Sequence, residues 1–327
     1  MGTWLARRLL AAVAIVFAVV TLTFLLMHLG PASPIVPGPE QPLDPDVVAR
    51  LRHQFGTDRP LAIQYTRYLA QLAHGNLGVS FSQRRPVRAA LADAIPNTIV
   101  LAGTALLIDF GLGLLLGVVM AARARSRTDA ALGNLTLFLR SVPTFWLALI
   151  AVLVLGERLH WFPVGGTIDI VRHQSFSFVG RIADRLWHLA LPALTLGIVG
   201  AAGTARFQRN ATLDALGADY VRTARAKGVA ERRIVAVHAL RNALLPAITL
   251  FGLALPFLLT GAVLIETVFA WPGMGKLAAD AVFSRDYPVV LACALAASVM
   301  VVAGNLAADV LYAAADPRIR IVERDRA

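Results

Sequence analysis

Long apolar runs separated by polar segments dominate the chain. Six runs reach the roughly 20 residues that a helix needs to cross a hydrocarbon core about 30 Å thick. They cover residues 9–29, 97–120, 132–155, 189–207, 244–269 and 289–312. The fourth run is short and contains Pro192, Gly197, Gly200 and Gly203, although closely packed membrane helices use such small residues at their interfaces. The pattern predicts an all-α integral membrane protein, six transmembrane helices being favoured over five.

The first run follows Arg7 and Arg8 and looks at first like a signal peptide. It is too long for a typical signal-peptide core, and no small-x-small cleavage site precedes Pro31. We therefore expect a retained N-terminal helix, residues 1–30.

The polar segment 31–96 predicts a small domain outside the membrane. Asp44 and Pro45 are typical of a helix start, with apolar spacing that continues to Gly56. Pro60 opens a second amphipathic helix that ends before Gly75. An extended piece over 77–82 and a turn at 84–86 follow.

Composition supports the membrane assignment. Hydrophobic residues make up 57% of the chain and charged residues 16%, against roughly 45–50% and 25% in soluble domains. The net charge of +11 would suggest nucleic acid as a partner in a soluble chain, but most of the excess lies in short loops. With the N-terminus inside, 17 of the 31 Lys and Arg residues fall inside and 13 outside. The positive-inside rule therefore predicts cytoplasmic N- and C-termini and no nucleic-acid partner.

The sequence offers little for catalysis. Its one cysteine, Cys293, lies in an apolar run, so neither a disulfide framework nor a thiolate metal cluster is expected. The seven histidines are scattered, and no G-x-x-x-x-G-K-[ST] loop is present to cradle phosphates. We expect a non-catalytic chain with no metal and no cofactor of its own.

The segment 208–243 is too long and too patterned for a simple connection. Asp219 is placed to cap a basic helix that runs to Lys227, and Gly228 is placed for a left-handed residue after its end. A second helix is predicted over 231–240, before Pro246. A basic helix of this kind also suits packing against anionic lipid, so the pattern leaves both roles open.

These residues carry a family resemblance. The run Asp219, Tyr220, Val221, Arg222, Thr223, Ala224, Arg225, Ala226, Lys227 and Gly228, followed by residues 238–246, resembles the EAA loop of permeases of ATP-driven (ABC) importers. The variant is that of the dipeptide, oligopeptide and nickel branch, with Thr223 in place of the family's leading Glu. The resemblance implies a type I importer fold in which the helix over 219–227 couples to a separate ATPase subunit.

Three further motifs resemble the same branch, in order along nearly the whole chain. They are residues 55–60 with 75–80, residues 141–146, and an outer turn that includes Glu266, Trp271, Pro272 and Gly273. The implied domains are the first helix, an extracytoplasmic domain over 31–96, a permease core over 97–312 with its coupling loop over 208–243, and a cytoplasmic tail over 313–327.

The resemblance also implies partners and a location. The expected partners are a second homologous permease, two ATPases that bind ATP and Mg²⁺, an extracytoplasmic substrate-binding protein and the lipid bilayer of a bacterial inner membrane. The implied cargo is a dipeptide or oligopeptide, with a nickel chelate or glutathione as alternatives. An ion-coupled secondary transporter and a non-transporting membrane sensor or assembly subunit stay open as other classes.

Ionisable residues within the spans are candidates for function, since a charge at mid-bilayer costs at least about 2.5 kcal/mol. Asp309 lies near the inner end of its run. Asp109 and Arg140 lie at similar depths on different runs, so they are predicted either to form an ion pair or to line the translocation path with Ser141 and Pro143.

Overall fold

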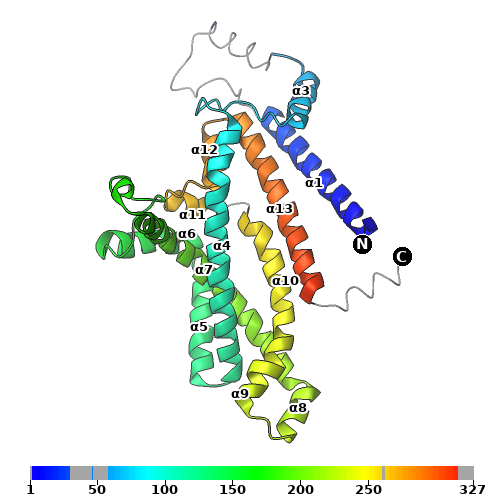
Figure 1. Cartoon of the computed structure of the whole chain (residues 1–327), viewed down its shortest axis with the longest axis vertical. Helices are drawn as coiled ribbons and strands as arrows, with labels where there is room; N and C mark the ends of the chain where they lie inside the picture. Colours follow the sequence, from blue (N-terminus) through cyan, green and yellow to red (C-terminus); the bar gives the residue numbers. More distant parts are fainter. Residues whose placement is uncertain (1, 30–45, 47–57, 260–261, 316–327) are drawn as a thin grey trace. The chain divides into compact units, whose positions relative to one another are not determined.

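The structure is a computed structural model that describes residues 2–29, 46, 58–259 and 262–315. Within these residues the secondary structure is helical, apart from an isolated antiparallel bridge between Val79 and Pro86 (Figure 1). Five of the described helical segments are long and apolar enough to cross a membrane, and a bent pair of helices adds a sixth candidate. The all-α membrane fold predicted from the hydrophobic pattern is confirmed.

The long helices are α1 (Gly2–Leu29), α4 (Val87–Ala122), α7 (Phe178–Gly217), α10 (Leu240–Leu259) and α13 (Tyr287–Ala315). The described chain forms two compact units. The first comprises residues 1–96 and 273–300, and the second comprises residues 97–272 and 301–327. Because these boundaries fall within α4 and α13, each of these helices contributes to both units.

In the first unit, the amphipathic helix α3 (Leu61–Ala73) packs against α1. Phe24 lies 5.2 Å from Tyr65 and 5.6 Å from Tyr68 between ring centres, and the Thr21 hydroxyl lies 2.6 Å from that of Tyr65. Burial, and then the neighbouring Tyr65, raises the pKa of Tyr68 to about 12. The predicted α3 helix is confirmed, whereas the helix predicted from Asp44 to Gly56 lies outside the described residues, Asp46 excepted.

The core of the first unit joins the beginnings of α4 and α13 to α12 (Met274–Phe283). Its buried side chains include Val87, Met274, Val289 and Cys293. A fully buried carboxylate, Asp286, accepts hydrogen bonds from the hydroxyls of Ser80 and Ser82 and from the Ser82 amide. These bonds fasten the predicted extended segment 77–82 to the start of α13.

In the second unit, α7 and α4 approach closely through small residues. A Cβ added at Gly113 would lie 2.6 Å from the Thr204 Cβ, and one at Gly197 would lie 2.6 Å from the Ile108 Cβ. The weakest apolar run of the sequence is thus the middle part of a 40-residue helix that continues through Pro192. Tight packing, more than hydrophobicity, explains the composition of that run.

The third apolar run is not the single straight helix that its pattern suggests. It forms α5 (Arg127–Ser141) and α6 (Thr144–Ala151), which continues into the π-helix η1 (Val152–Arg158), and the pair is bent by 97°. Val142 at the break is extended, with φ −83° and ψ 129°. The reason is Pro143, whose ring disfavours helical geometry in the residue before it.

The fifth run also differs from its predicted limits of 244 and 269. The helix begins earlier, at α9 (Glu231–Arg233), and passes through the π-helix η3 (Ile234–Ala239) into α10, with Pro246 inside the helix. At the other end α10 is described as far as Leu259, and a separate short helix, α11 (Val263–Val268), follows the non-helical Ala262. Apolar composition alone did not distinguish one long helix from two.

Candidate functional site

The predicted coupling segment forms a short helix, α8 (Asp219–Ala226), between α7 and α9. Its cap is Ala218, with φ −74° and ψ 152°, and no side chain caps it. Asp219 instead lies in the first turn, where its carboxylate interacts favourably with the helix dipole and lies 3.6 Å from Arg222. The predicted side-chain cap at Asp219 is therefore wrong, because the cap position falls one residue earlier, at Ala218.

Gly228 ends α8 as predicted, with φ +73°. Its amide donates to the Arg225 carbonyl at 2.9 Å, and the Val229 amide donates to the Ala224 carbonyl at 3.2 Å. The left-handed glycine thereby reverses the chain and satisfies carbonyls at the helix end.

The α8 loop (residues 218–239) has a core of its own. Val221 and Ile234 are fully buried, and Ala224 is buried beside them with Leu216 and Val229 packed around the cluster. An ion pair between Arg225 and Glu231, 2.6 Å long, closes the loop on its surface. The hydrogen bond from Arg225 to Glu231 raises the pKa of the Arg225 guanidinium.

The other side chains of α8 are exposed. The exposed members of the predicted coupling segment are Asp219, Tyr220, Arg222, Thr223, Arg225, Ala226, Lys227 and Gly228. Val221 and Ala224 point into the loop's own core, so neither is part of the exposed face of α8. A cavity of about 410 Å³ adjoins α8 and is lined by Tyr220 together with residues of α7 and α10.

Asp109 on α4 is buried against α7. Its Oδ1 accepts a hydrogen bond of 2.6 Å from the Thr204 hydroxyl, and a Cβ at Gly200 would collide with its Oδ2. Among the described residues no ion pair joins Asp109 to Arg140, so the predicted pairing is not formed in this geometry. Matched depth on two helices did not bring the side chains together, because each faces α7 separately.

Arg140, in the last turn of α5, lies against α7 one turn away from Asp109. A Cβ at Gly203 would lie 2.5 Å from the Arg140 Nη1, so the guanidinium lies directly against the backbone of α7 at this glycine. Ser141 bonds back to the Leu137 carbonyl at 2.9 Å, and Pro143 precedes α6 at the bend. Neither of these two predicted path residues lies at the cavity described next.

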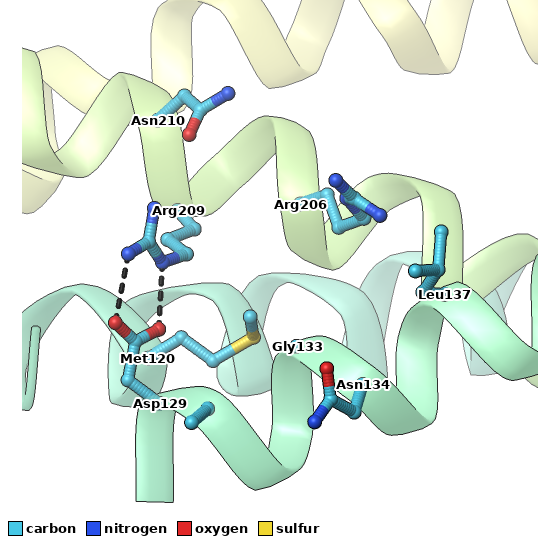
Figure 2. Close-up of a pocket in the computed structure, with 9 residues that line it drawn as sticks. Met120, Asp129, Gly133, Asn134, Leu137, Arg206, Arg209 and Asn210 are labelled. Carbon is cyan, nitrogen blue, oxygen red and sulfur yellow. Dashed lines mark hydrogen bonds and ion pairs between the residues drawn. The ribbon is translucent and has the colours of Figure 1, made fainter. Parts of the chain in front are cut away.

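A cavity of about 310 Å³ lies between the N-terminal part of α5 and the C-terminal part of α7 (Figure 2). Arg209 makes a two-pronged ion pair with Asp129, with both nitrogen–oxygen distances 2.7 Å. Ser126 caps α5 by accepting from the Asp129 amide, and the Arg125 amide donates to the Asp129 carboxylate. The remaining polar lining is Arg206, Asn134 and Asn210. Sequence reasoning missed this cavity, although Arg206, Arg209 and Asn210 have the spacing of one helix face.

The predicted outer turn is well packed. Glu266 is fully buried and accepts a hydrogen bond of 3.0 Å from the Thr98 hydroxyl. The Trp271 indole donates to the Asn97 carbonyl, and the Asn97 amide donates to the Pro272 carbonyl, both at 3.0 Å. Gly273 precedes α12 in extended geometry. These contacts fasten α11 to α4 and indicate a structural role for the turn.

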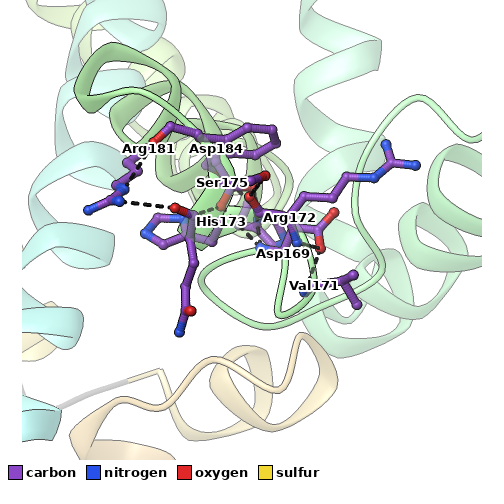
Figure 3. A network of polar contacts seen from close by, with 10 residues as sticks. Asp169, Val171, Arg172, His173, Ser175, Arg181 and Asp184 are labelled. Atoms are coloured by element: carbon purple, nitrogen blue, oxygen red, sulfur yellow. Dashed lines mark hydrogen bonds and ion pairs between the residues drawn. The ribbon is translucent and has the colours of Figure 1, made fainter.

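A polar network that the sequence did not indicate organises the loop between η1 and α7 (Figure 3). Asp184 on α7 accepts from the Asp169 amide and lies 2.6 Å from the Nδ1 of His173. Asp169 accepts from the amides of Val171 and Arg172, which lower the pKa of its carboxyl. Because the pKa of the Asp169 carboxyl is lowered in the folded protein, its hydrogen bonds stabilise the fold above the ordinary aspartate pKa. That stabilisation is lost as pH falls through the lowered value.

Apolar helices packed through glycines, with a folded and basic loop between two of them, define a polytopic membrane protein. The chain belongs to the family of binding-protein-dependent transport system inner membrane components, whose model matches residues 113–321. A second model, for the N-terminal part of such membrane components, matches residues 1–102. The protein is thus an inner-membrane component of a transport system that depends on a binding protein.

Similarity to curated relatives extends over almost the full chain. The chain is 38% identical to the oligopeptide transport system permease protein AppB of Bacillus subtilis, over 98% of this chain and 99% of the relative. It is 41% identical to the di/tripeptide transport system permease protein DppB of Pseudomonas aeruginosa, with the same coverage. It is 39% identical to the glutathione transport system permease protein GsiC of Salmonella paratyphi A, again with the same coverage.

Proposed function

We propose that this chain is a membrane-spanning permease subunit of an ATP-driven importer of dipeptides or oligopeptides. The observation that carries the proposal is the α8 loop, which folds around its own core and presents a basic helix within a family of transport permeases. Two relatives that match 98% of the chain are named for oligopeptide and di/tripeptide transport. A glutathione importer is the second candidate, supported by the relative of that name.

In the proposed assembly the chain pairs with a second homologous permease, two ATPase subunits and an extracytoplasmic binding protein. The ATPases bind ATP and Mg²⁺, and the permease holds no nucleotide. Both termini and the α8 loop lie in the cytoplasm. The binding protein delivers the peptide to the outer side of the paired permeases.

The α8 loop supplies the means of coupling. A helix transmits motion only if it does not deform under load, and three features oppose deformation here: the buried Val221 and Ile234, the reversal at Gly228 and the Arg225–Glu231 ion pair. When the ATPases close, they move the exposed face of α8, and α7 and α10 move with it. The membrane helices then alternate between outward and inward access.

The test is co-purification of the tagged chain with its ATPases, together with ATP-dependent uptake of a labelled dipeptide into vesicles that hold the whole complex. Ala226→Glu changes the exposed side of α8, and we expect normal amounts of permease but weakened ATPase association and little uptake. Ala224→Glu is the matched substitution on the buried side, and we expect it to reduce the amount of folded permease. Full association and uptake by Ala226→Glu would show that α8 is not the coupling element, and competition by glutathione would separate the two cargo candidates.

A further inference from the structure

Two arginines without a partner mark the packing line between α5 and α7, which we term the α5–α7 seam (Arg140, Gly203, Arg206, Arg209 and Asp129). Arg140 lies against Gly203, and Arg206 lines the 310 Å³ cavity about one helical turn further along α7. Among the described residues, neither arginine makes a hydrogen bond or an ion pair, whereas Arg209 is neutralised by Asp129 (Figure 2). The seam therefore carries a surplus of positive charge.

A surplus of positive charge is unusual inside an apolar run such as the one that contains Arg140. Arg140 lies 13 residues along α5, about 20 Å from the start of the helix at 1.5 Å per residue. A guanidinium within an apolar span is costly, so such residues face a bundle interior or a water-filled cavity and mark substrate paths. Arg140 lies within the apolar run 132–155 and not at its end, which favours a transported anion over a lipid phosphate as its ligand.

The donors along the seam suit a carboxylate. A guanidinium presents a planar fork of N–H groups that matches the two oxygens of a carboxylate. Asn134 and Asn210 add amide donors at the wall of the cavity beside Arg206. Asp129 already occupies Arg209 in this geometry, and Asp109 is buried and bonded to Thr204, so the groups open to a ligand are Arg140 and Arg206.

We propose that Arg140 and Arg206 bind a carboxylate of the transported peptide at two successive positions along the α5–α7 seam. The inference rests on the proposed function, because it assigns a role to the C-terminal carboxylate of a peptide cargo. Gly203 marks the first position, because the Arg140 guanidinium lies against α7 there. The two positions pass the carboxylate along α7 towards the end of the helix that carries the α8 loop.

The experiment compares two dipeptides that differ only in a free or an amidated C-terminus, with uptake measured in vesicles that contain the complete complex. Arg140→Gln and Arg206→Gln should each lower uptake of the free-acid peptide by about tenfold or more, because a hydrogen bond to a charged group is lost. Uptake of the amide should stay unchanged relative to the unaltered complex. Because the binding protein is identical throughout, a change in the ratio of the two uptakes reports on the permease.

Two further variants sharpen the result. Arg140→Lys keeps the charge and should recover part of the preference for the free acid. Arg158→Gln removes an exposed arginine at the end of η1, away from the seam, and should leave both uptakes unchanged. Uptake is expressed per amount of permease in the membrane, so that a loss of folded protein is not counted.

An equal fall in uptake of both peptides, or no change in either, would overturn the carboxylate assignment while leaving the proposed function intact. Loss of co-purified anionic phospholipid with an unchanged uptake ratio would likewise overturn it in favour of a lipid phosphate. Failure of the unaltered complex to import either peptide would overturn the proposed function, and this inference with it.

Discussion

Gly228 shows how one residue decides the geometry of the α8 loop. Its φ of +73° is easily adopted by glycine, whereas a residue with a side chain pays about 1–2 kcal/mol there. A Cβ added at this position would meet no atom within 4 Å. The backbone conformation, and not crowding, is therefore what requires glycine.

Gly228→Val should fray the end of α8 and weaken ATPase association, with the permease still present in the membrane. Gly217→Val is the matched control, because Gly217 also has open space around it but lacks a positive φ. Pull-down of the ATPases with each variant measures the difference. Equal association for the two variants would show that the left-handed turn is not needed for coupling.

At the scale of elements, packing of α7 against α4 depends on which glycines face the neighbouring helix. Gly113 is buried and lies against Thr204, whereas Gly111, two residues away on the same helix, has nothing within 4 Å of an added Cβ. The two positions are indistinguishable by composition. Helical periodicity separates them, because residues two apart lie on different faces.

Gly113→Ala should therefore destabilise the folded permease by about 1–3 kcal/mol, the usual cost of overpacking. Gly111→Ala should be neutral or slightly stabilising, because alanine favours a helix more than glycine does. Thermal unfolding of the purified chain in detergent compares the two. Equal losses for both variants would mean that α4 and α7 do not pack through Gly113.

At the scale of the whole molecule, the bent third run decides the topology. If the pair formed by α5 and by α6 with η1 did not cross the membrane, every later segment would lie on the opposite side. The proposed cytoplasmic position of the α8 loop therefore requires that this bent pair cross, despite its 97° break.

Reporter fusions after Gln71 and Arg172 should report the outside, and fusions after Asp129, Leu216 and Arg320 should report the inside. The physical basis is the excess of Lys and Arg in the segments expected inside. Arg172 is the decisive position, since it follows the bent pair. A cytoplasmic signal there, together with an outside signal at Leu216, would make the third run a re-entrant loop and place α8 away from the ATPases.

The sequence by itself determined the features that depend on local chemistry. Runs of about 20 apolar residues predicted the membrane helices, since a helix of that length spans the hydrocarbon core and satisfies its backbone hydrogen bonds internally. Pro60 and Gly75 bounded α3, and Gly228 ended α8, because these residues restrict or permit particular backbone angles. The motif around α8 also led to the family that the comparisons show.

Tertiary structure alone decided which side chains meet. Asp109 and Arg140 have matching depths, but depth does not fix the direction of a side chain around a helix, and each faces α7 separately. The Arg209–Asp129 pair joins residues 80 positions apart, a distance at which sequence spacing carries no information on contact. The burial of Ala224 likewise depends on how neighbouring segments pack, because the same residue in isolation permits exposure.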